Sequence, residues 1–167
     1  MINLSHYETR HLQAAEGWLE LGLYEDAIRE LEQLQPPADQ CPQALLLKTA
    51  AFYAASKWQL CLDAALQLIQ AEPELGTAYV NASIALYRLH RTQDAWNLLH
   101  PVLEKLNATW LIPYNLACYA AQLGQPEEAF RMYALALGRG EAALVKEQAL
   151  RDPDLKPIWG AIKETGQ

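Results

Sequence analysis

The sequence has few of the residues that mark a metalloprotein, a disulfide scaffold or a hydrolase. Its 167 residues include only three cysteines, Cys41, Cys61 and Cys118. An odd number without close pairs argues against a disulfide framework, and no Cys/His spacing typical of a zinc site appears. The four histidines are scattered and form no HExxH-like pair. We therefore expect neither a metal nor another cofactor.

Long apolar runs and an excess of basic charge are also missing. No apolar stretch approaches the ~20 residues that a membrane-spanning helix needs, and the first residues carry no basic segment followed by an apolar run. Thirteen basic residues face 20 acidic ones, so the formal net charge is −7. A net negative field repels phosphate backbones. These properties predict a cytoplasmic protein that binds neither nucleic acid nor membrane.

The sequence does contain a repeat with a period of 34 residues. Stepping by 34 from Ala27 gives Cys61, Ala95 and Ala129, which are all small. A second series is small as well, and it consists of Ala15, Thr49, Ser83 and Ala117. Small side chains at a fixed spacing let two helices cross closely, while apolar residues beside them fill the groove. The pattern predicts four helical hairpins over about residues 8–41, 42–75, 76–109 and 110–141, forming a single domain with residues 142–167.

Turn and cap signals support this register. Gly22 and Gly124 stand where the first helix of a hairpin should end, and Ser56 and His90 hold the equivalent places. Ser5 and Glu8 have the spacing of a capping box that starts the first helix. Pro101 falls inside an expected helix and should kink it or shorten it at His100.

The last 26 residues should form two further helices. Residues 141–151 predict a helix with Ala143, Leu144 and Leu150 on its apolar side, and residues 156–164 predict a short helix that carries Ile158, Trp159 and Ile162. Because solenoids expose an apolar face at each end, we expect this segment to cap the array. The alternative is a peptide-like segment for another molecule.

These features resemble the tetratricopeptide repeats over about residues 5–141. The matching residues include Gly22, Tyr24, Ala27, Pro73, Ala95, Gly124, Ala129 and Tyr133. Departures include Cys61 in place of alanine and His90 in place of glycine. The resemblance implies an all-α fold, a right-handed α-α superhelix (solenoid) of four hairpins with C-terminal capping helices. It also implies that the first helix of each hairpin lines a concave, peptide-binding groove.

The resemblance places nine candidate peptide-binding residues in that groove: Leu46, Tyr53, Val80, Asn81, Ile84, Tyr87, Arg88, Tyr114 and Asn115. Asn81 and Asn115 lie one period apart, and a primary amide can pair with a peptide backbone of any sequence. Aromatic rings with a polar tip are common interface anchors, and Arg88 could hold a carboxylate. The alternatives are asparagines that bond neighbouring helix ends, aromatics that pack between helices, and a solvated arginine.

Three classes of function remain at this point. The first is a binding module, an adaptor or small chaperone that holds a peptide or helix of another protein in an apolar, aromatic groove. The second is self-association, as a homodimer or as a scaffold of a larger assembly, because exposed apolar patches rarely stay bare. The third is an enzyme, for which only Cys118 with His90 or His100 is on hand. We expect no enzyme, because a buried cysteine is the better interpretation of Cys118.

Overall fold

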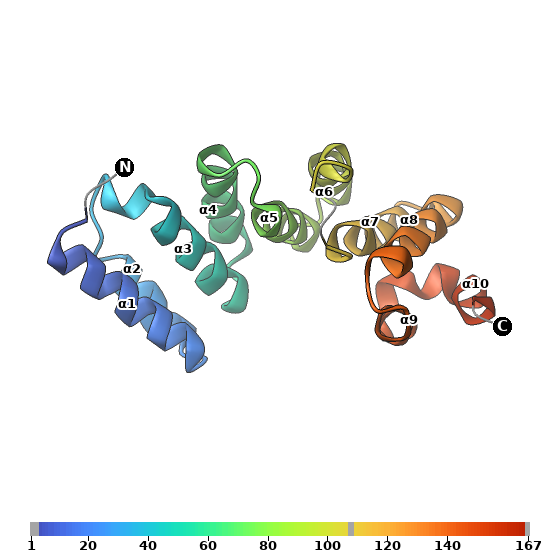
Figure 1. Cartoon of the computed structure of the whole chain (residues 1–167), viewed down its shortest axis with the longest axis horizontal. Coiled ribbons are helices and arrows are strands. Elements are labelled where there is room, and N and C mark those ends of the chain that lie inside the picture. The colour runs from blue at the N-terminus through green and yellow to red at the C-terminus, as the bar shows by residue number, and fades with distance from the viewer. Residues whose placement is uncertain (1–3, 107–108, 166–167) are drawn as a thin grey trace. The chain divides into compact units, whose positions relative to one another are not determined.

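The computed structural model describes residues 4–106 and 109–165, and every regular element in these residues is helical. Figure 1 shows the elements in chain order. They divide into two compact units, one that ends at Leu89 and one that begins at His90. Unit 1 contains α1 (His6–Glu20), α2 (Tyr24–Leu31), η1 (Ala38–Gln40), α3 (Pro42–Ala54), α4 (Trp58–Ala71) and α5 (Gly76–Arg88). Unit 2 contains α6 (Thr92–Leu99), η2 (His100–Val102), α7 (Leu111–Gln122), α8 (Pro126–Arg139), α9 (Ala142–Arg151), η3 (Pro153–Ile158) and α10 (Trp159–Glu164).

Helix ends follow the local signals of the sequence. At the start of α1, the Glu8 amide donates to Ser5 Oγ at 3.3 Å, and the Ser5 amide donates to Glu8 Oε2 at 2.6 Å. The predicted capping box is therefore confirmed. The Ser5 backbone bond also lowers the pKa of the Glu8 carboxyl. The effect of Pro101 is confirmed too, because α6 ends at Leu99 and His100 begins a 3-10 turn.

The four predicted turn residues share one unusual backbone conformation. Gly22 and Gly124 have φ of 72° and 73°, and Ser56 and His90 have φ of 56° and 60°. After Gly22, the Leu23 amide bonds back to the carbonyl of Trp18 at 2.9 Å, which is the six-to-one bond of a Schellman motif. The same bond follows Ser56 and Gly124. A left-handed residue every 34 positions thus ends each first helix.

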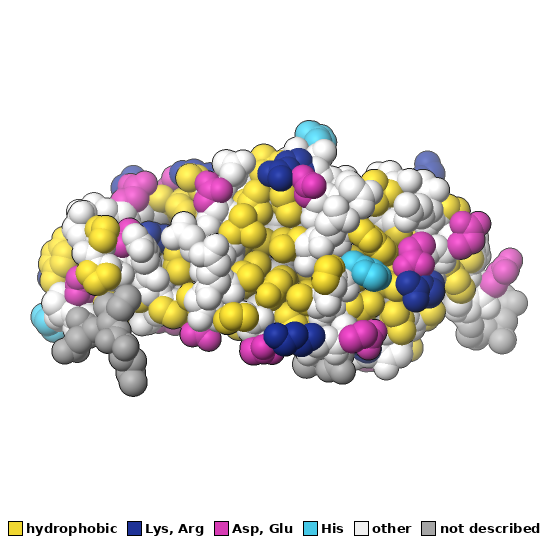
Figure 2. All heavy atoms as spheres, turned by 90° about the horizontal axis from the view of Figure 1, so that it is seen from above, with side chains coloured by type: hydrophobic (Ala, Val, Ile, Leu, Met, Phe, Trp, Pro, Cys, Tyr) yellow, Lys and Arg dark blue, Asp and Glu magenta, His cyan; other side chains and the backbone are white. Residues whose placement is uncertain are grey.

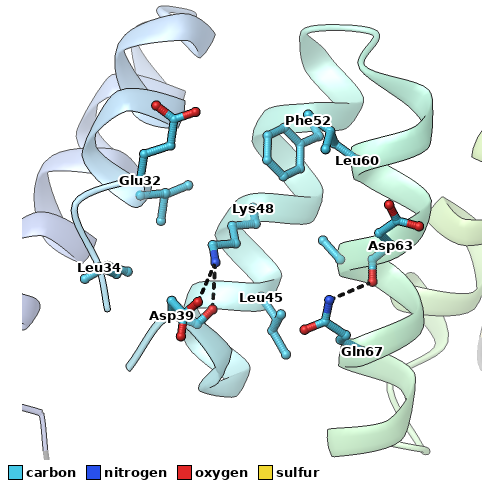
Figure 3. A pocket seen from close by; sticks show the side chains of 11 residues that line it. Glu32, Leu34, Asp39, Leu45, Lys48, Phe52, Leu60, Asp63 and Gln67 are labelled. Carbon is cyan, nitrogen blue, oxygen red and sulfur yellow. Dashed lines mark hydrogen bonds and ion pairs between the residues drawn. The ribbon is translucent and has the colours of Figure 1, made fainter. Parts of the chain in front are cut away.

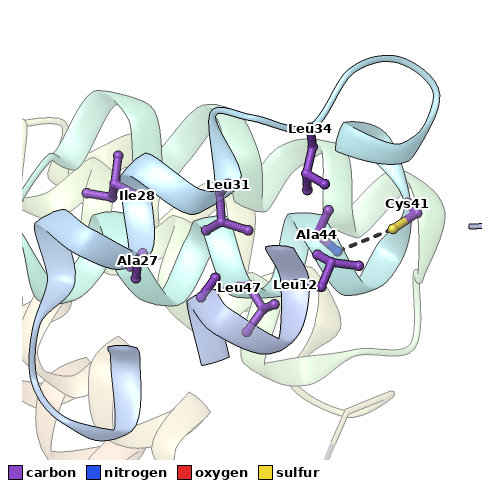
Figure 4. Close-up of a cluster of buried hydrophobic side chains, with 10 residues drawn as sticks. Leu12, Ala27, Ile28, Leu31, Leu34, Cys41, Ala44 and Leu47 are labelled. Carbon is purple, nitrogen blue, oxygen red and sulfur yellow. Dashed lines mark hydrogen bonds between the residues drawn. The ribbon is translucent and has the colours of Figure 1, made fainter. Parts of the chain in front are cut away.

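Unit 1 has its core where α1, α2 and α3 meet. Figure 4 shows this cluster, in which Leu12, Ile28, Leu31, Leu34 and Leu47 surround smaller side chains. The two small-residue series lie at such contacts, and every one of their eight members is completely buried. The buried hydroxyls of Thr49 and Ser83 each donate to a backbone carbonyl of their own helix at 2.8 Å.

Unit 2 is built around the α7–α8 hairpin. Helix α6 packs on α7, α9 packs on α8, η3 packs on both α7 and α8, and α10 packs on η3 and α9. The buried side chains of the last segment are Leu155, Ile158 and Ile162. The prediction of which α9 residues are buried is wrong. Val145 and Ala149, one turn apart on one face of α9, are buried, whereas Leu144 is 50% exposed.

Candidate protein-binding surface

The predicted groove residues of unit 1 lie on α3 and α5, which pack against each other. On α3, Leu46 and Tyr53 are 43% and 39% exposed, although both are large and apolar or aromatic. Their spacing of seven residues puts them on one side of the helix, two turns apart. This side of α3 therefore offers contact area that unit 1 does not bury itself.

Three side chains form an aromatic cluster at one end of this surface. The ring of Tyr53 meets the ring of Trp58 edge-on, with centroids 5.8 Å apart and an interplanar angle of 82°. The guanidinium carbon of Arg88 lies 5.7 Å from the centroid of the Trp58 ring. Tyr53, Trp58 and Arg88 come from α3, α4 and α5, so the cluster joins all three helices. Arg88 stays exposed although its guanidinium group lies over an aromatic ring.

Trp58 was not among the sequence candidates. It is the first residue of the second helix of its hairpin, whereas the family pattern draws attention to first helices. A signal was present nonetheless, because Tyr53 and Trp58 are both aromatic and flank the tight turn at Ser56.

The remaining unit 1 candidates differ in accessibility. Asn81, Ile84 and Tyr87 are half-buried on α5. Val80 is only 7% exposed, so the expectation that it lines an open groove is wrong. Leu12, which holds the same place in the first repeat, is 1% exposed and belongs to the core of Figure 4.

Figure 2 shows one face of the molecule, on which hydrophobic side chains gather over α4 and α5 while charged side chains lie mostly around them. The four large hydrophobic residues of α3 and α4 that are exposed are Leu46, Tyr53, Leu60 and Leu66. Unit 1 therefore leaves apolar area open on both helices of its second hairpin.

The corresponding face of α7 in unit 2 is covered by the chain's own C-terminal segment. The Tyr114 hydroxyl donates to Asp152 Oδ2 at 3.0 Å, and the Cys118 thiol donates to the same oxygen at 3.6 Å. One turn further along α7, Gln122 Nε2 donates to the carbonyl oxygen of Asp154 at 2.9 Å. Tyr114 is only 4% exposed, so its predicted place in an open groove is wrong.

This contact changes the chemistry of both donors. Burial, with the nearby Asp152 carboxylate, raises the pKa of the Tyr114 hydroxyl and raises the pKa of the Cys118 thiol well above its ordinary value. Both groups stay protonated and act as hydrogen-bond donors. A protonated, buried thiol is a poor nucleophile, which fits the interpretation of Cys118 as a core residue.

The two asparagines of the predicted peptide clamp behave differently from each other. Asn115 Nδ2 donates to the carbonyl oxygen of Leu111 at 2.8 Å, one turn earlier in the same helix. This acceptor belongs to α7 itself, so it is not the neighbouring helix end of the alternative interpretation. For Asn81, no side-chain hydrogen bond to another described residue is found, and the amide is half-buried on α5.

Within residues 4–106 and 109–165, no group of three or more His, Cys, Asp or Glu side chains is placed to hold a metal ion. Among the same residues, none of the helices combines the length and the apolar character that crossing a bilayer requires.

The fold resembles solved structures of MamA. No family model matches the chain, and no curated protein matches it in sequence. A crystal structure of MamA covers 96% of this chain and 92% of its own, with a TM-score of 0.75 at 15% identity. The structure of MamA from Desulfovibrio magneticus RS-1 (residues 41 to the end) covers 97% of this chain and 96% of its own, with a TM-score of 0.75 at 15% identity. A structure of MamA of AMB-1 covers 96% of this chain and 99% of its own, with a TM-score of 0.68 at 17% identity.

This likeness defines the class of protein. The chain is an all-α helical solenoid, as the sequence predicts, and it shares that fold with MamA, whose structures are solenoids of tetratricopeptide-like hairpins. At such low identity the likeness concerns the fold alone.

Proposed function

We propose that the chain is a protein-interaction module of the tetratricopeptide type, an adaptor or small chaperone of the cytoplasm. Unit 1 holds a hydrophobic or amphipathic segment of another polypeptide on the α3–α5 surface, defined as Leu46, Tyr53, Trp58, Asn81, Ile84, Tyr87 and Arg88. The observation that carries the proposal is the exposure of Leu46 and Tyr53 beside the aromatic cluster. Large apolar side chains at such levels of exposure, near an accessible arginine, are typical of interface anchors.

The chemistry of the surface selects the kind of segment. Leu46 and Ile84 offer aliphatic area, Tyr53 and Trp58 offer aromatic area, and Arg88 offers a charge-assisted fork for a carboxylate. The segment should therefore present an apolar face with an acidic residue at the end that meets Arg88. Elsewhere the net charge of −7 repels acidic partners, so the contact with Arg88 also sets the orientation of the segment.

Affinity capture with the full chain from its source cell tests the proposal. Leu46→Ala with Tyr53→Ala should remove the captured partner, while helical content by circular dichroism stays unchanged. Leu144→Ala is the matched control, because Leu144 is 50% exposed on α9, away from this surface, and its loss should leave capture of the partner unchanged. Equal capture by the parent and the Leu46/Tyr53 variant would show that the α3–α5 surface is not the binding site.

Self-association is a second candidate function, and a separate observation favours it. Leu21, the residue directly after α1, is 70% exposed beside a hollow of about 460 Å³ lined by Ala14, Gly17, Trp18, Glu20, Leu21 and Glu30. Small residues beside a large exposed leucine suit the approach of another helix, such as that of a second copy. Light scattering over a range of concentrations tests this. A mass that rises with concentration in the parent and stays monomeric in Leu21→Asp supports a scaffold role, whereas a monomeric parent excludes it.

A further inference from the structure

The exposed face of α1 carries large side chains that unit 1 does not cover. Helix α1 packs against α2 and α3, and its buried residues are Leu12 and Ala15. Tyr7, near the start of the helix, is 56% exposed, and Leu21, directly after its end, is 70% exposed. Apolar and aromatic area is therefore open at both ends of the same helix.

These two residues belong to one stripe along α1. Its members are separated alternately by three and four residues, which keeps them on a single helix face as in the seam of a coiled coil. The α1 stripe consists of Tyr7, Arg10, Ala14, Gly17 and Leu21. Its middle residues, Ala14 and Gly17, are small and line the hollow of about 460 Å³. The stripe is thus low in the middle and high at its ends.

Gly17 has no evident role inside the described part of the chain. It lies within α1, where glycine is about 1 kcal/mol less favourable than alanine. A Cβ at this position would meet no atom within 4 Å, and Gly17 lacks the positive φ that favours glycine at Gly22. A glycine in such a place lets the backbone of another helix approach closely.

Two charged residues beside the hollow also lack partners. Arg10 and Glu20 are exposed, and neither forms an ion pair with another described residue. Figure 3 shows the contrasting case of Lys48, whose Nζ lies 2.8 Å from the backbone carbonyl oxygen of Asp39 and 3.7 Å from its Oδ2. The other basic side chains of residues 4–89 are engaged in the same way, Arg29 with Asp26, Lys57 with Glu25, and Arg88 with the Trp58 ring. Arg10 differs from all of them.

We propose that α1 pairs with α1 of a second copy in antiparallel orientation, about a two-fold axis between Ala14 and Gly17. The inference rests on self-association, the second candidate function above. In this orientation Ala14 of each copy meets Gly17 of the other, so the backbones approach at small residues. Arg10 of each copy lays its stem on Leu21 of the other and reaches the carboxylate of Glu20 there. Because the interface is isologous, this ion pair forms twice.

The charges select the antiparallel orientation. A parallel pair would place Arg10 beside Arg10, with Glu20 about 15 Å further along the helix axis. The antiparallel pair instead brings opposite charges together at both ends of the hollow. An isologous contact is complete with two copies, so association should stop at a dimer. A single pair of helices is a small interface, so the dimer should be weak.

Sedimentation equilibrium of the full chain, from about 10 μM to about 1 mM, tests the pairing. Arg10→Glu and Glu20→Arg should each raise the dimer Kd about tenfold, whereas the double variant should recover the parent's Kd within about threefold. Glu127→Arg is the control, because it makes the same charge change at an exposed residue of α8 and should leave the Kd unchanged. Circular dichroism checks that every variant is folded.

Cross-linking reports the orientation directly, since the three native cysteines are buried. In the antiparallel pair the two copies of residue 17 lie next to the axis, whereas the two copies of residue 7 are about 25 Å apart. A short thiol cross-linker should therefore join chains with Gly17→Cys and leave chains with Tyr7→Cys separate. Joined Tyr7→Cys chains would indicate a parallel pair and overturn the proposal.

The outcomes separate this pairing from self-association in general. A parent that stays monomeric at every concentration would exclude both. A dimer that persists while the double charge variant stays as weak as the single variants would overturn the antiparallel α1 contact alone. The same conclusion would follow from a dimer in which Gly17→Cys chains are not joined.

Discussion

The four left-handed turn residues allow a test of the repeat by stability alone. A residue with a side chain in the left-handed region costs roughly 1–2 kcal/mol, whereas glycine occupies this region freely. Ser56 and His90 therefore carry a strain that Gly22 and Gly124 avoid at the same place in the repeat. Against this, glycine makes the unfolded chain more flexible, which costs about 0.5–1 kcal/mol. Ser56→Gly should thus stabilise the protein by a net ~0.5–1 kcal/mol.

Replacing either glycine by alanine tests the same strain, because the left-handed backbone conformation is the only source of destabilisation. A Cβ at Gly124 would meet no atom within 4 Å, and a Cβ at Gly22 would meet only the Tyr24 hydroxyl, at 3.8 Å. Gly22→Ala and Gly124→Ala should each destabilise the protein by about 1 kcal/mol through φ rather than through a clash.

Urea unfolding followed by circular dichroism measures the effect of all three changes, and thermal melting checks them. For a chain of this size, 1 kcal/mol corresponds to roughly 2–4 °C in Tm. Ser56→Ala is the control, since it removes the hydroxyl but keeps the Cβ, and it should not stabilise. If Ser56→Gly proved neutral or destabilising while Ser56→Ala stabilised, the side chain rather than the backbone would be responsible. That result would contradict backbone strain at Ser56.

Three further predictions concern single contacts. Tyr114→Phe removes the hydroxyl donor of Asp152 and should destabilise the protein by about 1–2 kcal/mol in urea unfolding, and an unchanged midpoint would contradict the contact. Burial raises the pKa of the Cys61 thiol from 9.0 to about 11. Because the folded protein then holds this proton more tightly than the unfolded chain, stability should fall between pH 9 and 11, and Cys61→Ala should lessen the fall. Gly140→Ala should cost about 1–3 kcal/mol, since its Cβ would come within 2.9 Å of the Trp110 ring, and a Tm equal to the parent's would refute this.

The repeat and its turns were predictable because they depend on short-range physics. Small residues at a fixed period, a capping box, and the left-handed turn at Ser56 each act within one hairpin, so the local sequence reports them. Exposure was less predictable: Leu46, Tyr53 and Arg88 are exposed, whereas Val80 and Tyr114, placed in the groove by the same family pattern, are buried.

The covering of α7 could not be predicted in this way. The contact of Tyr114 with Asp152 joins residues that the period does not relate to a groove, and it depends on how the tail turns after α9.

The docking of the tail on α7 has a consequence for the order of folding. Most helix contacts of unit 2 join neighbours in the chain, such as α7 with α8, and form with little loss of loop entropy. The bonds of Tyr114 and Cys118 to Asp152 instead span 38 and 34 residues, and they require the α7–α8 hairpin as a platform. The tail should therefore be the last part of unit 2 to become protected from hydrogen exchange during refolding.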